Sequence, residues 1–205
     1  MVEQNKIEFV CTANHGRSPV AALIASNYLK QIGADEYNAI SSGSHVDAIN
    51  RGEVSTDFML HVIGIAQDRG MYSYDENELL SDVIADVDKG ALDTLKGFYE
   101  RASGIFVREE HQYRSEILPL LGIKGEIKQT QDQTIARPDT LGVYPMADSN
   151  HQAVDRIYGE SEYRPKVIEP LGISNAFGLS KEAYQGSIEE IVVKVPQKIN
   201  ELLGV

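Results

Sequence analysis

The strongest local pattern in the chain is the stretch Ile7-Glu8-Phe9-Val10-Cys11-Thr12-Ala13-Asn14-His15-Gly16-Arg17-Ser18-Pro19. Its first four residues are mostly apolar, which predicts a short buried strand that runs into a loop containing Gly16. Ser18 and Pro19 favour a helix start, because Ser is a common N-cap residue and Pro fits the first helical position. The helical spacing continues as far as Gly33, through Ala21, Ala25, Leu29 and Ile32. The order strand, loop, helix puts the loop at the carboxyl end of a strand.

The remainder of the chain alternates between short apolar runs and helical patterns. Alternation of this kind predicts a mostly parallel sheet with helices on both faces. We expect a single three-layer α/β domain over residues 1–205, with a four-stranded parallel sheet. The expected strands are residues 38–42, 105–107 and 166–168, and the expected helices are residues 92–102, 109–121 and 181–203, the last kinked at Pro196.

Two segments do not follow this alternation. Residues 67–91 are rich in Asp, Glu and Tyr, and residues 129–164 are polar and contain Pro138 and Pro145. We interpret both as excursions on the surface. Neither differs enough in composition to predict a separate domain.

The composition excludes several classes of function. The net charge is −12 and no basic run occurs, which argues against nucleic-acid binding. No run of about eighteen apolar residues predicts a membrane span, and the polar start of the chain is unlike a signal peptide, so we expect a cytoplasmic protein without a membrane partner. The chain has one cysteine, and its five histidines lack the spacing of metal ligands. We therefore expect no disulfide framework, no metal and no cofactor.

The loop after the first strand has the features of an oxyanion cradle. Its backbone N–H groups can turn inward at the N-terminus of a helix, where the helix dipole adds positive potential. The helix end, the Arg17 guanidinium and the Ser18 hydroxyl would all favour the Cys11 thiolate, which is a nucleophile. Arg17 can bind two phosphate oxygens with its planar fork. The predicted phosphate-binding residues are Thr12, Ala13, Asn14, His15, Gly16, Arg17 and Ser18.

The motif Val10-Cys11-x-x-Asn14-x-x-Arg17-Ser18-Pro19 resembles the signature loop of the low-molecular-weight protein tyrosine phosphatases. The resemblance implies that Cys11 is the catalytic nucleophile and that Arg17 binds phosphate. It also implies that Ser18 stabilises the thiolate and that Asn14 holds the loop in shape. The turn at residues 41–44 resembles the Ser-rich turn after the family's second strand, so Ser42 would support the loop. His15 departs from the family loop, and we expect it to face the entrance.

The family's proton donor is the Asp of an Asp-Pro pair on a late loop, and this sequence has no Asp-Pro. Its one Glu-Pro pair, Glu169-Pro170, follows the expected strand 166–168 and precedes the last helix. The resemblance therefore implies Glu169 as the general acid. If Glu169 is not the acid, the next candidates are Asp139 and Asp148 in the segment 129–164. The aromatic residues that clasp a phenyl ring beside the family's acid are missing, since Leu171 and Gly172 follow the Pro.

The sequence thus predicts a cysteine-dependent phosphomonoester hydrolase that acts through a cysteinyl-phosphate intermediate. Its substrate would be a phosphorylated small molecule or a phosphoprotein, protein phosphotyrosine included. Two alternatives stay open. One is an arsenate reductase that uses an external thiol, because the chain has no second cysteine to resolve the oxidised product. The other is a non-catalytic protein that binds phosphate or phosphoproteins.

Overall fold

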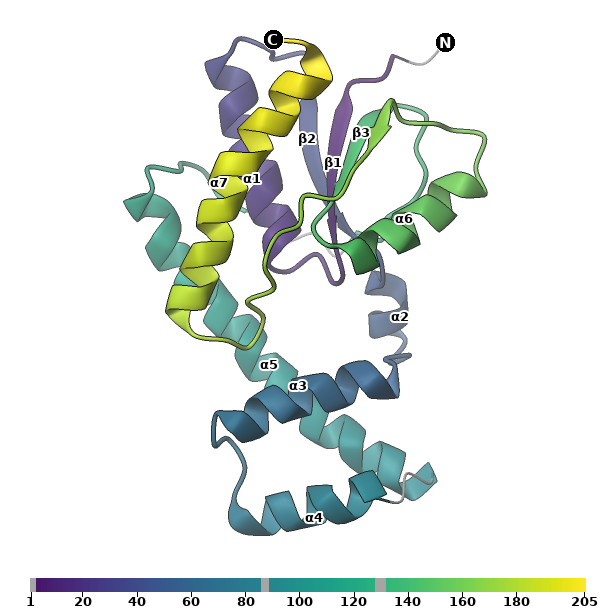
Figure 1. Cartoon of the computed structure of the whole chain (residues 1–205), viewed down its shortest axis with the longest axis vertical. Helices are drawn as coiled ribbons and strands as arrows, with labels where there is room; N and C mark the ends of the chain where they lie inside the picture. The colour runs from purple at the N-terminus through teal and green to yellow at the C-terminus, as the bar shows by residue number, and fades with distance from the viewer. Residues whose placement is uncertain (1–2, 86–88, 128–131) are drawn as a thin grey trace.

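The four strands form one sheet in the order β2-β1-β3-β4, so the first strand lies in its interior. The computed structural model of the chain describes residues 3–85, 89–127 and 132–205. Each pair of neighbouring strands is parallel, which confirms the predicted α/β fold with a four-stranded parallel sheet. Figure 1 shows β1 between β2 and β3. The strands are β1 (Lys6–Cys11), β2 (Asn38–Gly43), β3 (Thr140–Pro145) and β4 (Val167–Ile168).

Helices cover both faces of the sheet (Figure 1). The helices α1 (Arg17–Gln31) and α7 (Lys181–Leu203) pack side by side over one face, and α6 (Asp148–Gly159) lies over the other. Successive β1 side chains point to opposite faces, so Phe9 joins the core under α1 and α7 while Val10 joins the core under α6. This burial on both faces explains why three apolar residues, Phe9, Val10 and Cys11, follow one another in β1.

The helix α7 has the bounds that the sequence predicts. The Ser180 hydroxyl accepts a hydrogen bond from the Ala183 N–H and caps the start of the helix. The helix ends at Gly204, whose φ of 74° lies in the left-handed region that glycine adopts without strain. Pro196 lies inside the helix.

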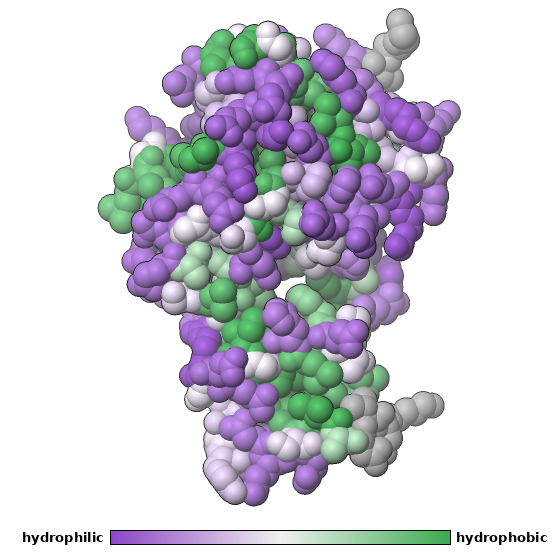
Figure 2. Space-filling view, viewed as in Figure 1, coloured by the Kyte–Doolittle hydropathy of each residue, from purple (hydrophilic) through white to green (hydrophobic). Residues whose placement is uncertain are grey.

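A helical lobe, residues 46–106, is inserted between β2 and β3 and has a core of its own. It contains α2 (Val46–Asn50), α3 (Thr56–Asp68), α4 (Tyr74–Ala85) and the first half of α5 (Lys89–Leu120). Figure 1 shows it beneath the sheet, and Figure 2 shows a hollow between the two parts. Its buried core residues are Met59, Val62, Ile63, Ala66, Tyr72, Leu80, Leu95, Tyr99, Ala102 and Phe106.

The helix α5 connects the two parts of the molecule. It has 32 residues, about 48 Å at the usual rise per residue, and its later residues Ile117 and Leu118 belong to the core under the sheet. The prediction of a strand at residues 105–107 is wrong, because these residues lie inside α5. Phe106 packs in the core of the lobe instead of in a sheet. The two helices predicted around this segment are therefore parts of one helix.

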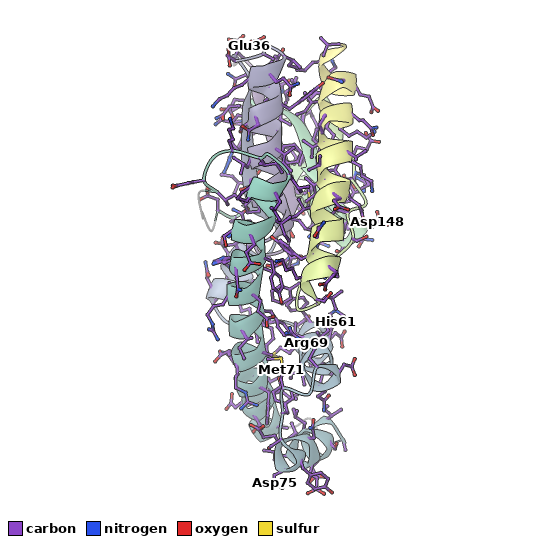
Figure 3. All side chains as sticks on the ribbon, turned by 90° about the vertical axis from the view of Figure 1, so that its left-hand side faces the viewer. Glu36, His61, Arg69, Met71, Asp75 and Asp148 are labelled. Carbon is purple, nitrogen blue, oxygen red and sulfur yellow. The ribbon has the colours of Figure 1, made fainter. Side chains whose placement is uncertain are left out.

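Arg69, at the end of α3, ties the lobe to the segment before α7. Its guanidinium donates to both carboxylate oxygens of Glu109 at 2.8 Å and to the Gly178 carbonyl at 3.0 Å. Figure 3 shows Arg69 where α3, α5 and the start of α7 approach one another. A bidentate Arg–carboxylate pair of this kind fixes direction as well as distance.

The segment 129–164 differs from the expected surface excursion, since it contains β3 and α6. Residues 128–131 lie outside the described residues. β3 pairs with β1 and β4, and the Phe9 and Tyr144 rings stack with centroids 5.7 Å apart. Gly142 and the terminal Pro145 interrupt the apolar run of this strand and conceal it in the sequence. Among the described residues, no helix is both apolar enough and long enough to cross a membrane.

Candidate active site

The loop from Cys11 to Ser18 lies at the carboxyl end of β1, where the chain order of the sheet reverses between β2 and β3. Ligands of open parallel sheets bind at this kind of position. Cys11 is the last residue of β1, and Gly16 is the N-cap of α1. The Ser44 N–H donates to the Cys11 carbonyl at 2.8 Å, and the His45 N–H donates to the Thr12 carbonyl at 3.0 Å. The turn after β2 thus holds the start of the loop.

Asn14 gives the loop its shape. Its φ of 54° makes it the one residue other than glycine with positive φ among the described residues. Asn tolerates this left-handed conformation better than most residues. Gly43 packs against the same part of the loop, since a Cβ built on it would lie 2.8 Å from the Asn14 nitrogen and from the Thr12 oxygen. A side chain at position 43 would therefore displace the loop.

Ser18 is the centre of the hydrogen-bond network under the loop. Its Oγ lies 3.0 Å from Cys11 Sγ, 3.0 Å from Asn14 Oδ1 and 3.2 Å from the Ser42 carbonyl. A hydroxyl has one proton to donate, so these three acceptors compete for it. A thiolate is the charged acceptor among them, and hydrogen bonds to charged groups are the stronger ones. The structure therefore brings together Cys11, Asn14, Ser18 and Ser42 as the sequence predicts.

A buried carboxyl group lies behind this network. Glu8 is fully buried in β1, and it accepts hydrogen bonds from Ser42 Oγ at 2.6 Å and from the Tyr158 hydroxyl at 3.2 Å. Ser42 Oγ also contacts Thr134 Oγ1 at 2.7 Å. Burial raises the pKa of Glu8, and the hydrogen bond from Ser42 opposes part of this shift. Glu8 thereby anchors the Ser42 side chain while the Ser42 carbonyl contacts the loop.

Asn150, in the first turn of α6, is a contact of the loop that the sequence reading missed. Its Nδ2 donates to Thr12 Oγ1 at 3.1 Å and to Ser44 Oγ at 3.3 Å, and the side chain is almost fully buried. The polar residues that begin α6 follow β3 directly, which is the usual place for a site on a parallel sheet. Because the sequence pattern does not predict β3, it also does not predict a site residue directly after this strand.

Arg17 is held beside the loop by the segment that follows β4. Its Nη1 donates to the Ile173 carbonyl at 2.9 Å. Burial lowers the pKa of Arg17, and the nearby acidic groups Cys11, Glu110 and Glu190 oppose the shift. The guanidinium remains charged at any working pH and lies at the start of α1, where the helix end adds positive potential.

Glu169 does not lie at the loop. Its N–H donates to the Val143 carbonyl, so the residue continues β4 alongside the middle of β3. In the register of the sheet, Ile168 pairs with Val143, and Val143 pairs with Glu8, three residues before Cys11. Glu169 therefore lies about two residues behind Cys11, or roughly 7 Å along the sheet. The carboxylate of Glu169 accepts a hydrogen bond from Lys198 Nζ at 2.9 Å. This geometry does not fit the predicted donation of a proton to a leaving group at Cys11.

The two substitute acids lie at opposite ends of the sheet. Asp139 pairs with Lys6 at 2.6 Å, at the start of β1 and away from the loop. Asp148 is exposed at the start of α6, at the same edge of the sheet as the loop.

Two residues of α5 contact the loop, and the sequence reading assigned neither of them to the site. Arg114 Nη1 donates to the His15 carbonyl at 2.7 Å. The Glu110 side chain is buried and lies against Gly16. His15 itself is partly buried, and burial lowers the pKa of its imidazole, with the Arg114 charge adding to the shift. No sequence signal connects α5 with the loop, because about one hundred residues separate them.

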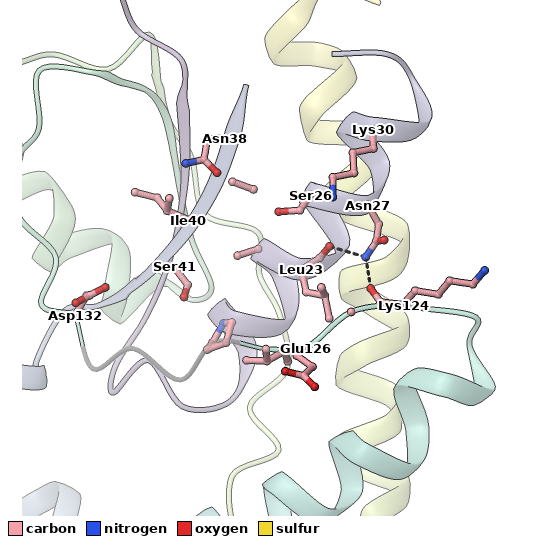
Figure 4. Close-up of a pocket in the computed structure, with 15 residues that line it drawn as sticks. Leu23, Ser26, Asn27, Lys30, Asn38, Ile40, Ser41, Lys124, Glu126 and Asp132 are labelled. Atoms are coloured by element: carbon pink, nitrogen blue, oxygen red, sulfur yellow. Dashed lines mark hydrogen bonds between the residues drawn. The ribbon is translucent and has the colours of Figure 1, made fainter. Parts of the chain in front are cut away.

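A separate groove of about 550 Å³ lies on the outer side of α1 and β2 (Figure 4). The Asn27 side chain donates to the carbonyls of Leu23 and Lys124, which joins the segment after α5 to α1. The groove has both acidic and basic side chains and does not contain Cys11. Among the described residues, no cluster of His, Cys, Asp and Glu could hold a metal ion.

The comparisons with known proteins agree with this geometry. The family model described as low molecular weight phosphotyrosine protein phosphatase matches residues 6–115. The comparison with curated proteins gives no significant match.

Among solved structures, a protein tyrosine phosphatase from Entamoeba histolytica has a TM-score of 0.55 at 13% identity, over 98% of this chain and 99% of that chain. A low molecular weight protein tyrosine phosphatase from T. tengcongensis has a TM-score of 0.51 at 16% identity, over 97% and 99%. An arsenate reductase in the oxidised state has a TM-score of 0.52 at 14% identity, over 97% and 99%. At such identities these likenesses concern the fold.

The family match covers more than half of the chain, and it contains the whole loop from Cys11 to Ser18. The chain belongs to the low molecular weight phosphotyrosine protein phosphatase family of hydrolases.

Proposed function

We propose that this protein hydrolyses phosphomonoesters through a cysteinyl-phosphate intermediate on Cys11. In the first step the thiolate attacks phosphorus, the S–P bond forms, and the ester P–O bond breaks with its electron pair on the leaving oxygen. In the second step water attacks phosphorus, the S–P bond breaks, and inorganic phosphate and the thiolate are released. The chemistry needs no cofactor.

One observation carries the proposal, namely the Ser18 hydroxyl 3.0 Å from the Cys11 sulfur in a loop shaped by left-handed Asn14. A buried cysteine that served only for packing would not need a hydroxyl donor beneath its sulfur. The same hydroxyl can stabilise the thiolate before attack and after the intermediate breaks down.

Arg17 supports the proposal as the phosphate-binding residue. The Ile173 carbonyl holds its guanidinium at the loop. A guanidinium fixed in this place can stabilise the negative charge that develops on the equatorial phosphoryl oxygens during phosphoryl transfer. The backbone N–H groups of the loop, from Thr12 to Ser18, would supply the remaining hydrogen bonds to the phosphoryl group.

We assign no proton transfer to Glu169, because its carboxylate is held by Lys198 well behind the loop. Without a positioned acid, the reaction favours leaving groups that depart as anions, such as phenols of low pKa. An activated small phosphoester is therefore the first candidate substrate. Protein phosphotyrosine, whose phenol has a pKa of about 10, would be hydrolysed more slowly.

A non-catalytic phosphate binder is the second candidate function, and the distant position of Glu169 favours it. Turnover separates the two. The test is hydrolysis of p-nitrophenyl phosphate by the parent protein, by Cys11→Ser and by the surface control Ser103→Ala. The proposal expects phosphate release by the parent and the control alone. Equal rates in parent and Cys11→Ser would refute the nucleophile, and no turnover in any variant would favour the binder.

A further inference from the structure

The carboxyl group of Glu110 occupies the space that a side chain at Gly16 would fill. A Cβ built on Gly16 would lie 2.7 Å from Glu110 Oε1 and 3.0 Å from Oε2, so the Glu110 carboxyl group would have to move to make room for it. The φ of Gly16 is −101°, outside the left-handed region, so the close approach of Glu110 and not the backbone conformation favours glycine here. The loop that is suited to an anion thus already has an acidic group packed against it.

Groups from three elements surround this carboxyl group. Arg17 on α1 and Arg114 on α5 contribute positive charge, and the Tyr184 hydroxyl on α7 interacts electrostatically with Glu110, Arg114 and Cys11. Glu110 is buried, and only 6% of it is exposed. Among the described residues, the buried Tyr184 hydroxyl has no hydrogen-bond partner.

An ionised Glu110 and a bound oxyanion would place two negative charges side by side around Gly16 and Arg17. Like charges at such close range disfavour each other strongly when little water screens them. Burial already raises the pKa of Glu110 to about 7, although both arginines oppose the shift. Near neutral pH the ionised and the neutral form of Glu110 therefore differ little in free energy, and a neighbouring anion can determine which form is populated.

We propose that Glu110 takes up a proton from solvent when an oxyanion enters the loop, so that anion binding and Glu110 ionisation exclude each other. The proposal rests on the proposed function only in that the loop binds an oxyanion. Glu110 is then a positioning residue, which acts through the charge of the loop and sets the pH range in which the loop binds its ligand.

Other groups near the loop titrate as well and must be separated from Glu110. The Cys11 thiolate would also repel an anion. Burial lowers the pKa of His15 and of His111, with the Arg114 charge adding to both shifts, and it raises the pKa of Tyr184. Glu190 has a pKa lowered mainly by its hydrogen bond from Ser174, so it stays ionised.

Sulfate is the best probe, because it remains a dianion throughout the working range and its own titration does not interfere. Sulfate affinity is measured by calorimetry on the intact chain carrying Cys11→Ser, which removes the thiolate, between about pH 5 and 9. We expect the dissociation constant to rise about tenfold per pH unit above the pKa of Glu110. Heats in two buffers of different ionisation enthalpy should give an uptake of about half a proton per sulfate at that pKa, rising to about one proton above it.

Glu110→Gln in the same background should bind sulfate with little pH dependence and without proton uptake. Its matched control is Glu109→Gln, on the neighbouring position of α5, where the carboxylate faces Arg69 instead of the loop. The control should keep the slope and the uptake of the Cys11→Ser parent.

The inference fails if Glu110→Gln keeps the slope, or if the slope disappears in His15→Asn or His111→Gln instead. Should Glu110→Gln not fold, proton uptake in the Cys11→Ser parent decides alone, and zero uptake overturns the inference.

Absence of sulfate binding at every pH contradicts both proposals. Sulfate binding with proton uptake but no phosphoester turnover by the parent refutes the hydrolase and leaves the inference intact.

Discussion

The Ser18 hydroxyl lies 3.0 Å from the Cys11 sulfur, and both groups are buried at the junction of β1 and α1. The strand ends at the cysteine, and the helix begins one residue before the serine. The proposed nucleophile and its hydrogen-bond partner therefore lie on two consecutive elements of the chain. For this reason the centre of the site is readable from the sequence.

Ser18→Ala should lower kcat for an aryl phosphate by about 10 to 100-fold, the effect of losing a hydrogen bond to a charged group. The rate of Cys11 alkylation by iodoacetamide should change with it, because the sulfur loses its hydrogen-bond partner. Steady-state kinetics and mass spectrometry measure both. Ser26→Ala, on the outer side of α1, is the control. An unchanged kcat would remove Ser18 from the chemistry.

Arg17→Lys should lower kcat by about 100-fold or more, since an ammonium cannot match two phosphate oxygens at once. Arg69→Lys is the matched control, because it breaks the bidentate pair with Glu109 but lies away from the loop. The control should lose stability and keep its kcat. Equal kcat values in parent and Arg17→Lys would contradict a role for the guanidinium in the transition state.

Glu169→Gln should slow good and poor leaving groups to the same small degree, because the carboxylate contacts Lys198 and not the loop. The partly exposed ion pair should contribute no more than about 1 kcal/mol to stability. The measurement is kcat/KM for a series of aryl phosphates of rising phenol pKa, with Glu201→Gln as the control that shares Lys198. Selective slowing of the poor leaving groups would restore Glu169 as the acid.

Glu8→Gln should flatten the pH dependence of the free energy of unfolding. The folded-state pKa of Glu8 lies above its unfolded value of 4.5, chiefly through burial. The stability that Glu8 contributes is therefore fully present below that unfolded pKa and is lost as pH rises through the folded pKa. A Gln at this position stays neutral, so its contribution to stability does not fall as pH rises. The substitution should lower the free energy of unfolding by about 1 kcal/mol, because one hydrogen bond is mismatched.

Urea unfolding from about pH 4 to 8 measures this effect. Glu190→Gln is the contrast, since the pKa of Glu190 is lowered by its hydrogen bond from Ser174 and the stability it contributes is lost as pH falls instead. The same slope in Glu8→Gln and the parent would mean that Glu8 does not titrate in this range.

The sequence predicts the elements whose residues carry a strong local pattern. The structure confirms β1, α1, β2 and α7 as elements, although α1 begins at Arg17 with Gly16 as its N-cap and not at the predicted N-cap Ser18. Three apolar residues, 105–107, are too few to show whether the apolar pattern repeats as in a helix or as in a strand. The predicted strand is therefore part of α5. Gly142 and Pro145 have the opposite effect in β3, where they resemble the signals of a loop.

The site divides in the same way. The contacts among Cys11, Asn14 and Ser18 join neighbours in the chain, and their spacing predicts them. The contacts of Glu110, Arg114 and Asn150 with the loop depend on tertiary packing, which the sequence pattern does not reveal. The prediction of Glu169 as the general acid rests on the dipeptide Glu169-Pro170. A dipeptide does not determine how far from the end of the sheet a residue lies.

The most direct test of the account is to trap the intermediate. The parent protein is mixed with an aryl phosphate, quenched in acid during turnover, digested and analysed by mass spectrometry. The account predicts one added phosphoryl group on the peptide that contains Cys11, and none in Cys11→Ser. Release of phosphate with the phosphoryl group on His15, or on no residue at all, would contradict it.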